Sequence, residues 1–167
     1  MPPDIHIVNH CWRYSRLMCY QVSALFTWPP KCRILYEVCC TADGDPRTVP
    51  WLREYAESSR RPSNVEIRLH LMEHDRLLRR GIGRNECSKA SEARVVLFCD
   101  TDKIWGPGCL DYVAENFPTD AEIVFPHYEF KCSHERGDQL IQSVTGPRIY
   151  DIDPLDFTIR ARQSTAI

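Results

Sequence analysis

The chain has 167 residues, of which 43% are hydrophobic and 26% are charged, so it is long enough to bury the core of one globular domain. Its formal net charge of −2 provides no basic surface for phosphate backbones, which argues against DNA or RNA as partners. No apolar run approaches the roughly 20 residues that cross a bilayer, and the N-terminus lacks the pattern of a secretory signal, so we expect a soluble, cytoplasmic protein without a transmembrane segment.

The chain contains nine cysteines, an odd number, and Cys39, Cys40 and Cys99 lie inside apolar segments. Such positions are typical of reduced core residues rather than of a disulfide framework. Zinc sites usually use paired spacings such as Cys-x-x-Cys, which the chain lacks. We therefore expect nine reduced thiols, and the spacing does not predict a structural zinc site.

The first half of the chain alternates strand patterns with helix patterns. Strands are predicted from short β-branched or apolar runs at 5–8, 34–40 and 65–71. One helix is predicted before the stop at Trp28, Pro29 and Pro30, and another over about 48–58. The loop TADGDP at 41–46 has strong turn chemistry.

The second half begins with the basic, glycine-containing segment RLLRRGIGRNECSKASEA at 76–93. A buried strand at 95–99, a helix from Pro107 and a further strand at 121–130 follow. Strands that alternate with helices predict an α/β fold, a mostly parallel sheet flanked by helices, in a single domain. The core should cover 1–130, and the pattern weakens over 131–167, so we expect that segment to be irregular or only partly ordered.

Two acids, Asp100 and Asp102, follow the strand VVLFC directly. Ligands of parallel α/β sheets bind at the carboxyl ends of the strands. Residues i and i+2 of an extended chain point the same way, so both carboxylates can face one Mg²⁺ or Mn²⁺ ion, which would neutralise a leaving diphosphate. The alternative is a polar turn that caps the next helix.

Four segments in this order resemble the nucleotide-binding half of family 2 glycosyltransferases, which have the GT-A fold. IHIVNHCWRYSRLMCYQVSAL resembles the first strand, nucleotide loop and first helix of that family, and CTADGDPRT resembles its acidic loop. GIGRNECSKAS is similar to the Gly-x-x-Arg-Asn element, and VVLFCDTDKIWGPGCLDYV to the D-x-D segment. The resemblance covers about residues 5–127.

The resemblance implies a role for each matching residue. The nucleoside would lie beside the backbone of His10 and Cys11, with its base near Asp43 and the diphosphate near Arg84. Asp100 would approach the ribose and the metal, and Asp102 would be the principal metal ligand.

An inverting transfer also needs a base for the acceptor hydroxyl, and in this family the base follows the D-x-D strand. Glu135 and Asp138 are the candidates, and His134 is a further candidate metal ligand, as is His127. Each of these residues is equally compatible with a surface position. By the same resemblance, 131–167 would form a short acceptor side of the domain.

The sequence therefore predicts a metal-dependent, inverting hexosyltransferase that uses Mn²⁺ or Mg²⁺ and a nucleotide-sugar donor, with a UDP-sugar as the first choice. The acceptor would be a carbohydrate or another hydroxyl compound. The chain is short for the family, so the acceptor site is either minimal or completed in a homo-oligomer. One alternative is a sugar-phosphate nucleotidyltransferase, although NHCWRYSR lacks the glycines of a phosphate loop. The other is a non-catalytic nucleotide-sugar-binding module.

Overall fold

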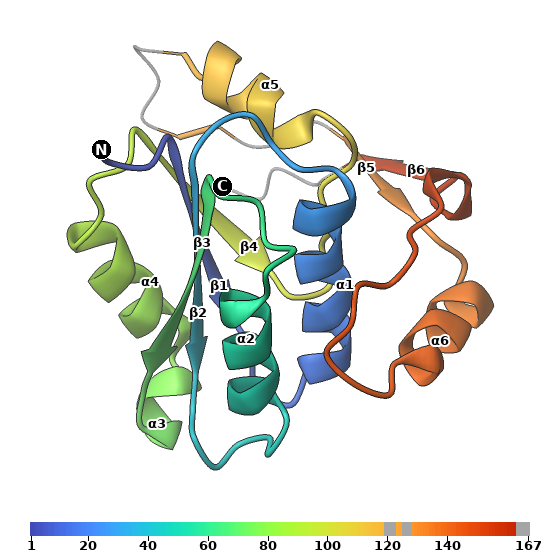
Figure 1. The fold of residues 1–167 in the computed structure, drawn as a ribbon, viewed down its shortest axis with the longest axis horizontal. Coiled ribbons are helices and arrows are strands. Elements are labelled where there is room, and N and C mark those ends of the chain that lie inside the picture. The colour runs from blue at the N-terminus through green and yellow to red at the C-terminus, as the bar shows by residue number, and fades with distance from the viewer. Residues whose placement is uncertain (119–122, 125–127, 163–167) are drawn as a thin grey trace.

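A parallel sheet forms the centre of the computed structural model, which describes residues 1–118, 123–124 and 128–162. Its strand order is β3-β2-β1-β4 (Figure 1). The strands are β1 (Ile5–His10), β2 (Ile34–Cys40), β3 (Val65–Leu71) and β4 (Val95–Asp100). Four of the five strands predicted from the sequence are thereby confirmed, with β1 two residues and β4 one residue longer than expected at their carboxyl ends.

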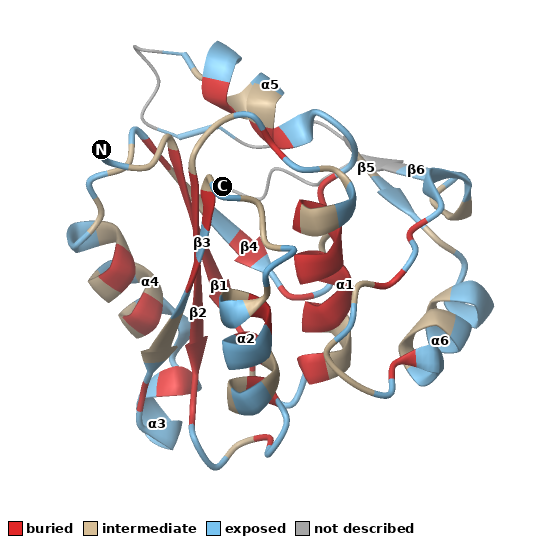
Figure 2. Ribbon diagram, in the orientation of Figure 1, coloured by how far each residue is buried: buried red, intermediate tan, exposed pale blue. Residues whose placement is uncertain are grey.

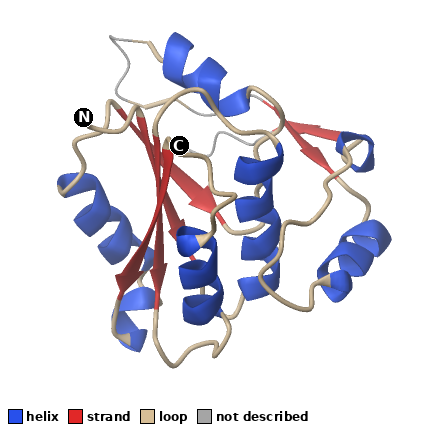
Figure 3. Ribbon diagram, in the orientation of Figure 1, coloured by secondary structure: helices blue, strands red, loops and turns tan. Residues whose placement is uncertain are grey.

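Helices cover both faces of this sheet, as Figures 1 and 3 show. One face carries α1 (Ser15–Thr27) and α2 (Thr48–Glu57). The other face carries α3 (His74–Leu77) and α4 (Arg80–Lys89). After β4 the chain forms α5 (Cys109–Asn116), whose Asp111 accepts hydrogen bonds from the backbone of Lys31 and Cys32.

The burial of each strand follows its place in the sheet. All residues of the central strands β1 and β2 are buried, whereas β3 at the edge alternates buried and exposed positions in its first half (Figure 2). Central parallel strands are covered on both faces, so they are apolar along their length, and an edge strand alternates. The strand β4, expected to be buried, instead lies at the other edge of the sheet, where only Val95 and Cys99 are buried.

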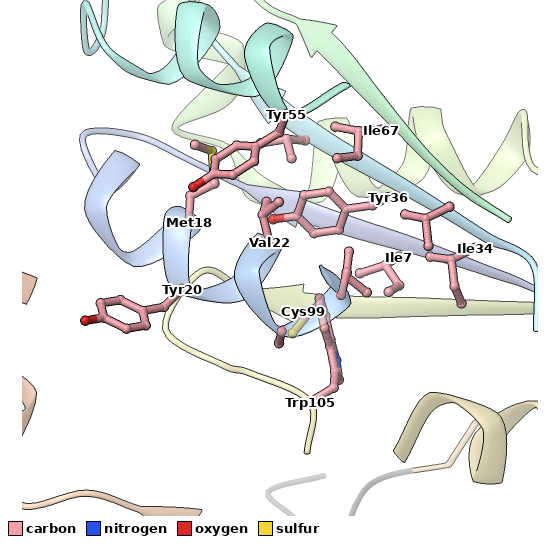
Figure 4. Close-up of a cluster of buried hydrophobic side chains, with 14 of the residues drawn as sticks. Ile7, Met18, Tyr20, Val22, Ile34, Tyr36, Tyr55, Ile67, Cys99 and Trp105 are labelled. Carbon is pink, nitrogen blue, oxygen red and sulfur yellow. The ribbon is translucent and has the colours of Figure 1, made fainter. Parts of the chain in front are cut away.

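The main core lies between the sheet and helices α1 and α2 (Figure 4). Ile7 and Tyr36 from the central strands pack against Met18 and Val22 of α1, and all four are 0% exposed. Burying side chains of this size stabilises the fold by about 1.5–3 kcal/mol each. This core fixes the strand ends and the loops that leave them.

The segment after β4 is more ordered than the sequence predicts. Strand β5 (Tyr128–Lys131) pairs with β6 (Ile159–Arg162) in an antiparallel ribbon, and α6 (His134–Ser143) and the short η1 (Pro154–Asp156) lie between them. The expectation of an irregular segment from 131 is therefore wrong. The buried residues of this C-terminal segment pack on α1 as isolated positions rather than as a repeated pattern. They therefore show no helical or strand periodicity in the sequence. The rest of the strand predicted at 121–130, with His127, falls largely outside the described residues.

Two further expectations concern the whole chain. All nine cysteines are free thiols, as predicted. Among the helices described, none is both long and apolar enough to cross a membrane.

Candidate functional site

The carboxyl ends of the central strands bring the predicted site residues to one edge of the sheet. His10 ends β1 and pairs in register with Cys39 of β2 on one side and with Asp100 of β4 on the other. The loops that follow these strands therefore leave the sheet side by side. This is the edge at which parallel α/β sheets bind ligands.

Arg84 and Asp100, both predicted site residues, are in contact. One guanidinium nitrogen of Arg84 lies 3.0 Å from Asp100 Oδ1, and Arg80 approaches the same oxygen at 3.4 Å. The Arg84 guanidinium also lies over the Phe98 ring, 5.6 Å from its centroid. Because an exposed ion pair contributes at most about 1 kcal/mol, the arrangement serves mainly to place two cations beside the carboxylate.

His10 lies beneath these arginines. It is 8% exposed, and neither ring nitrogen has a hydrogen-bond partner in the described part of the chain. Burial, with the positive charges of Arg84 and Arg80, lowers the pKa of His10 to about 4. The imidazole is therefore neutral at physiological pH and adds no charge to the site.

The D-x-D segment forms a turn rather than an extended strand end. The Lys103 amide donates to the Asp100 carbonyl at 3.0 Å, and the buried Thr101 hydroxyl donates to the His10 carbonyl. The expectation that Asp100 and Asp102 align through strand geometry is therefore wrong, because the chain turns immediately after Asp100.

The Asp102 carboxylate is exposed, and among the described residues it makes no hydrogen bond or ion pair. Carboxylate oxygens suit a hard cation such as Mg²⁺ or Mn²⁺, so an open Asp102 fits a metal. Asp100 shares its oxygen with arginine in this structure. His134 does not join the two aspartates in any group of described ligands within 4.8 Å.

A buried glutamine that the sequence analysis missed supports this turn. Gln21 of α1 is 0% exposed, and its amide nitrogen donates to the carbonyls of Asp100 at 3.0 Å and Lys103 at 2.6 Å. Its oxygen accepts from Tyr36 Oη at 2.6 Å and from the Asn9 amide. The sequence did contain a signal for this role, because Gln21 is a polar residue in the middle of the apolar face of a predicted helix.

The loop after β1 and the loop after β2 pack together at the same edge of the sheet. Arg13 has a positive φ of 63°, and its Nε donates to the Gly44 carbonyl at 3.3 Å. A Cβ on Gly44 would lie only 2.5 Å from the Thr41 methyl, so the close approach requires glycine. The Trp12 ring meets His74 edge to face at 5.9 Å.

The two acids of the loop after β2, Asp43 and Asp45, have different surroundings. Asp43 is exposed, and a hydrogen bond from the Thr41 hydroxyl holds the pKa of its carboxyl below the ordinary value. Asp45 is 4% exposed and accepts from the Arg47 backbone amide at 3.0 Å. Only Asp43 therefore presents an ionised carboxylate to solvent.

The base candidates Glu135 and Asp138 lie on α6, which packs against α1 through a hydrogen bond from Tyr20 Oη to the Leu140 carbonyl at 3.1 Å. Glu135, Asp138 and His134 are all exposed. No interaction in the described part of the chain joins them to the D-x-D turn.

A different acid contacts the turn. Lys103 Nζ lies 2.5 Å from Glu129 Oε2, and this pair joins β5 to the D-x-D segment. Glu129 is the third residue of the stretch HYEF at 127–130. No sequence pattern distinguished it from the other residues of the predicted strand. It is a residue that only the tertiary structure brings to the site.

Comparison with known proteins identifies the family of the chain. The pattern of Glycosyl transferase family 2 matches residues 31–163, which is well over half of the chain. A search of curated proteins found no match. The parallel sheet flanked by helices is the GT-A-like architecture that the sequence predicted. Members of the family generally depend on a divalent cation and take a nucleotide-sugar donor and an acceptor. The chain belongs to glycosyl transferase family 2.

Proposed function

We propose that the protein transfers a hexose from a UDP-sugar to a hydroxyl acceptor with inversion, and that Mn²⁺ or Mg²⁺ binds at Asp102. The observation that carries the proposal is the open Asp102 carboxylate beside the Asp100–Arg84 pair at the carboxyl edge of the sheet. A bound cation would neutralise the charge that develops on the departing nucleotide diphosphate.

The surrounding residues supply the other requirements of donor binding. Arg84 offers a guanidinium to the diphosphate, an acceptor that it can grip with two hydrogen bonds. Asp100 would then release Arg84 and contact the ribose and the cation instead. The backbone of His10 and Cys11 lines the nucleoside, and the exposed Asp43 carboxylate can accept an N–H of the base. Gln21 holds the carbonyls of the turn in place.

The acceptor side is proposed to lie after β4, with residues 131–167 contributing. Glu135 and Asp138 are the candidates for the base, and His134 is a candidate metal ligand. Glu129 is a further acid near the turn, through its pair with Lys103. Because α6 is exposed, a second copy of the chain could complete this side. We expect the protein to act in the cytoplasm.

The decisive experiment measures UDP binding by calorimetry, with Mn²⁺ present or absent, to the wild type and to Asp102→Asn. Asparagine keeps the size of the side chain and removes the charge, so we expect at least a tenfold loss of metal-dependent affinity, which is about 1.4 kcal/mol. The free energy of unfolding should change by no more than about 0.5 kcal/mol, since the side chain is exposed.

Asp151→Asn is the matched control, because Asp151 is also exposed but lies outside the matched D-x-D segment. It should bind UDP as the wild type does. Equal affinities of wild type and Asp102→Asn would refute the metal site. If binding is metal-dependent but UDP-sugars are never consumed with any acceptor, the binding-module alternative holds. Formation of a nucleotide-sugar from a sugar phosphate would instead support the nucleotidyltransferase.

A further inference from the structure

A second group of potential ligands lies on the α4 face of the sheet. Glu37 of β2, His70 of β3 and Cys87 of α4 each offer one ligand atom, and these atoms all lie within 4.8 Å of one another. Glu37 and Cys87 are buried, and His70 is partly exposed. The three residues come from three different elements, so their meeting is a property of the fold.

A second sulfur adjoins this group. Cys39 Sγ lies 3.7 Å from Cys87 Sγ, and both thiols are free and buried. Two sulfurs that bind one tetrahedral zinc at about 2.3 Å each would lie roughly 3.8 Å apart. The observed separation matches this value, but Cys39 is not in the group whose ligand atoms all lie within 4.8 Å of one another, so it is a neighbour of Cys87 rather than a fourth ligand.

The nitrogen and oxygen ligands show a related spacing. His70 Nδ1 lies 3.9 Å from Glu37 Oε1, which is too long for a hydrogen bond. Two such ligands of one zinc, each about 2.0–2.1 Å from the ion, would lie roughly 3.3 Å apart. The His70 side chain is partly exposed, so a shift of roughly half an ångström would bring this pair to that spacing.

The neighbours of the group orient its ligands. His70 Nε2 lies 3.2 Å from Glu86 Oε2, so a carboxylate can hold the nitrogen that faces away from Glu37. Metal-bound histidines usually have such a partner. On the other side, His6 Nε2 lies 2.8 Å from Glu37 Oε2, and His6 is 1% exposed. Its Nδ1 has no hydrogen-bond partner in the part of the chain that the structure describes.

We propose that Glu37, His70 and Cys87 form a zinc site, distinct from the D-x-D metal site, and that solvent fills the fourth position. Thiolate, imidazole and carboxylate together favour Zn²⁺, whereas the all-oxygen Asp102 site favours Mg²⁺ or Mn²⁺. Binding converts the Cys87 thiol to a thiolate, and its proton passes to solvent. No electron is transferred and no oxidant is required.

The site would fasten α4 to the middle of the sheet. Cys87 is on the same helix as Arg80 and Arg84, which contact Asp100. A metal that joins α4 to β2 and β3 would therefore stabilise the helix that places both arginines. This role does not depend on which reaction the protein catalyses.

The test uses the full chain, reduced, stripped of metal and titrated with Zn²⁺ against a chromophoric chelator. We expect one zinc per chain. Titration with Co²⁺ should give the intense near-ultraviolet absorption of a cobalt–thiolate bond and the visible bands of a tetrahedral ion. Cys87→Ser and His70→Gln should each lower zinc affinity at least about tenfold.

Two variants serve as controls. Cys40→Ser removes a buried thiol next to Cys39 that belongs to the core on the opposite face, so zinc affinity should not change. Asp102→Asn should also keep the affinity, which separates this site from the D-x-D site.

Equal zinc affinity of the wild type and Cys87→Ser would overturn the proposal, as would a cobalt spectrum without the thiolate band. If Cys87→Ser fails to fold, His70→Gln decides the matter, because its partly exposed side chain can be changed without opening the core.

Discussion

At the scale of single residues, buried polar groups fix the site more firmly than its exposed ions do. The pair of Arg84 and Asp100 is screened by solvent, because the Asp100 side chain is 48% exposed. Gln21, in contrast, is fully buried and joins α1 to two carbonyls of the D-x-D turn. Leaving a buried polar group without a partner costs about 1–3 kcal/mol. The amide of Gln21 is therefore the anchor of the turn.

Replacement of Gln21 by methionine keeps the volume and removes these hydrogen bonds. We expect a loss of about 1–3 kcal/mol in the free energy of unfolding, measured with denaturant, and weaker metal-dependent UDP binding, because the turn is no longer held. Tyr36→Phe is the control, since the Tyr36 hydroxyl donates to Gln21 but does not contact the turn. It should lose stability and keep UDP affinity. If both variants bind UDP like the wild type, Gln21 has only a structural role.

The sequence alone indicated Asp100, Asp102 and Arg84 as candidates, because each lies in a short segment whose chemistry is local, and the structure brings Arg84 and Asp100 into contact. It could not predict Gln21 or Glu129 as site residues. Their contacts with the D-x-D turn span between 26 and 82 residues, and no local pattern encodes such pairs. The same holds for the group of Glu37, His70 and Cys87, whose spacing matches no known zinc sequence motif.

At the scale of elements, prediction succeeded where a pattern was repeated within one element. The strands β1, β2 and β4 follow apolar runs, and α1 and α2 follow amphipathic ones. The segment after residue 131 was not predicted correctly, because α6 has no buried residue in its own span and so shows no buried face that repeats along the helix. That helix is supported by contacts with α1 that its own sequence does not show.

The packing of α4 against the sheet depends on one glycine. A Cβ on Gly83 would lie 2.8 Å from Cys39 Sγ and 2.9 Å from His10 Nε2, both in buried side chains. Gly83→Ala should therefore displace α4 and lower the free energy of unfolding by about 1–3 kcal/mol. Donor binding should also weaken in this variant, because Arg84 is the next residue of α4 after Gly83.

Gly81 offers the matched control on the same helix, because a Cβ there meets no atom within 4 Å. Gly81→Ala should raise stability by up to about 1 kcal/mol through helix propensity. Chemical denaturation of both variants measures the difference. Similar effects of the two substitutions would show that α4 does not pack as closely as the structure indicates.

At the scale of the whole molecule, the C-terminal segment is part of the main core. Val144, Tyr150 and Ile152 are at most 5% exposed and belong to the same cluster as the sheet and α1. Backbone contacts add to this, since Tyr55 Oη donates to the Arg148 carbonyl at 2.6 Å and the Tyr150 amide donates to Ser23 Oγ at 2.9 Å. The segment proposed as the acceptor side should therefore unfold together with the donor side.

This cooperativity can be tested with two substitutions close together in the chain. Ile152 is 5% exposed and Leu155 is 79% exposed. Ile152→Ala leaves a cavity in the shared core, so it should lower the free energy of unfolding by about 2–5 kcal/mol, whereas Leu155→Ala should change it by no more than about 0.5 kcal/mol. Denaturation followed by far-ultraviolet dichroism and by tryptophan fluorescence should give one coincident transition in both variants. All four tryptophans, Trp12, Trp28, Trp51 and Trp105, precede the C-terminal segment in the chain, so fluorescence reports the sheet and its helices. If Ile152→Ala separates the two curves, or leaves the tryptophan transition unchanged, the C-terminal segment is an independent unit and the single-core description is wrong.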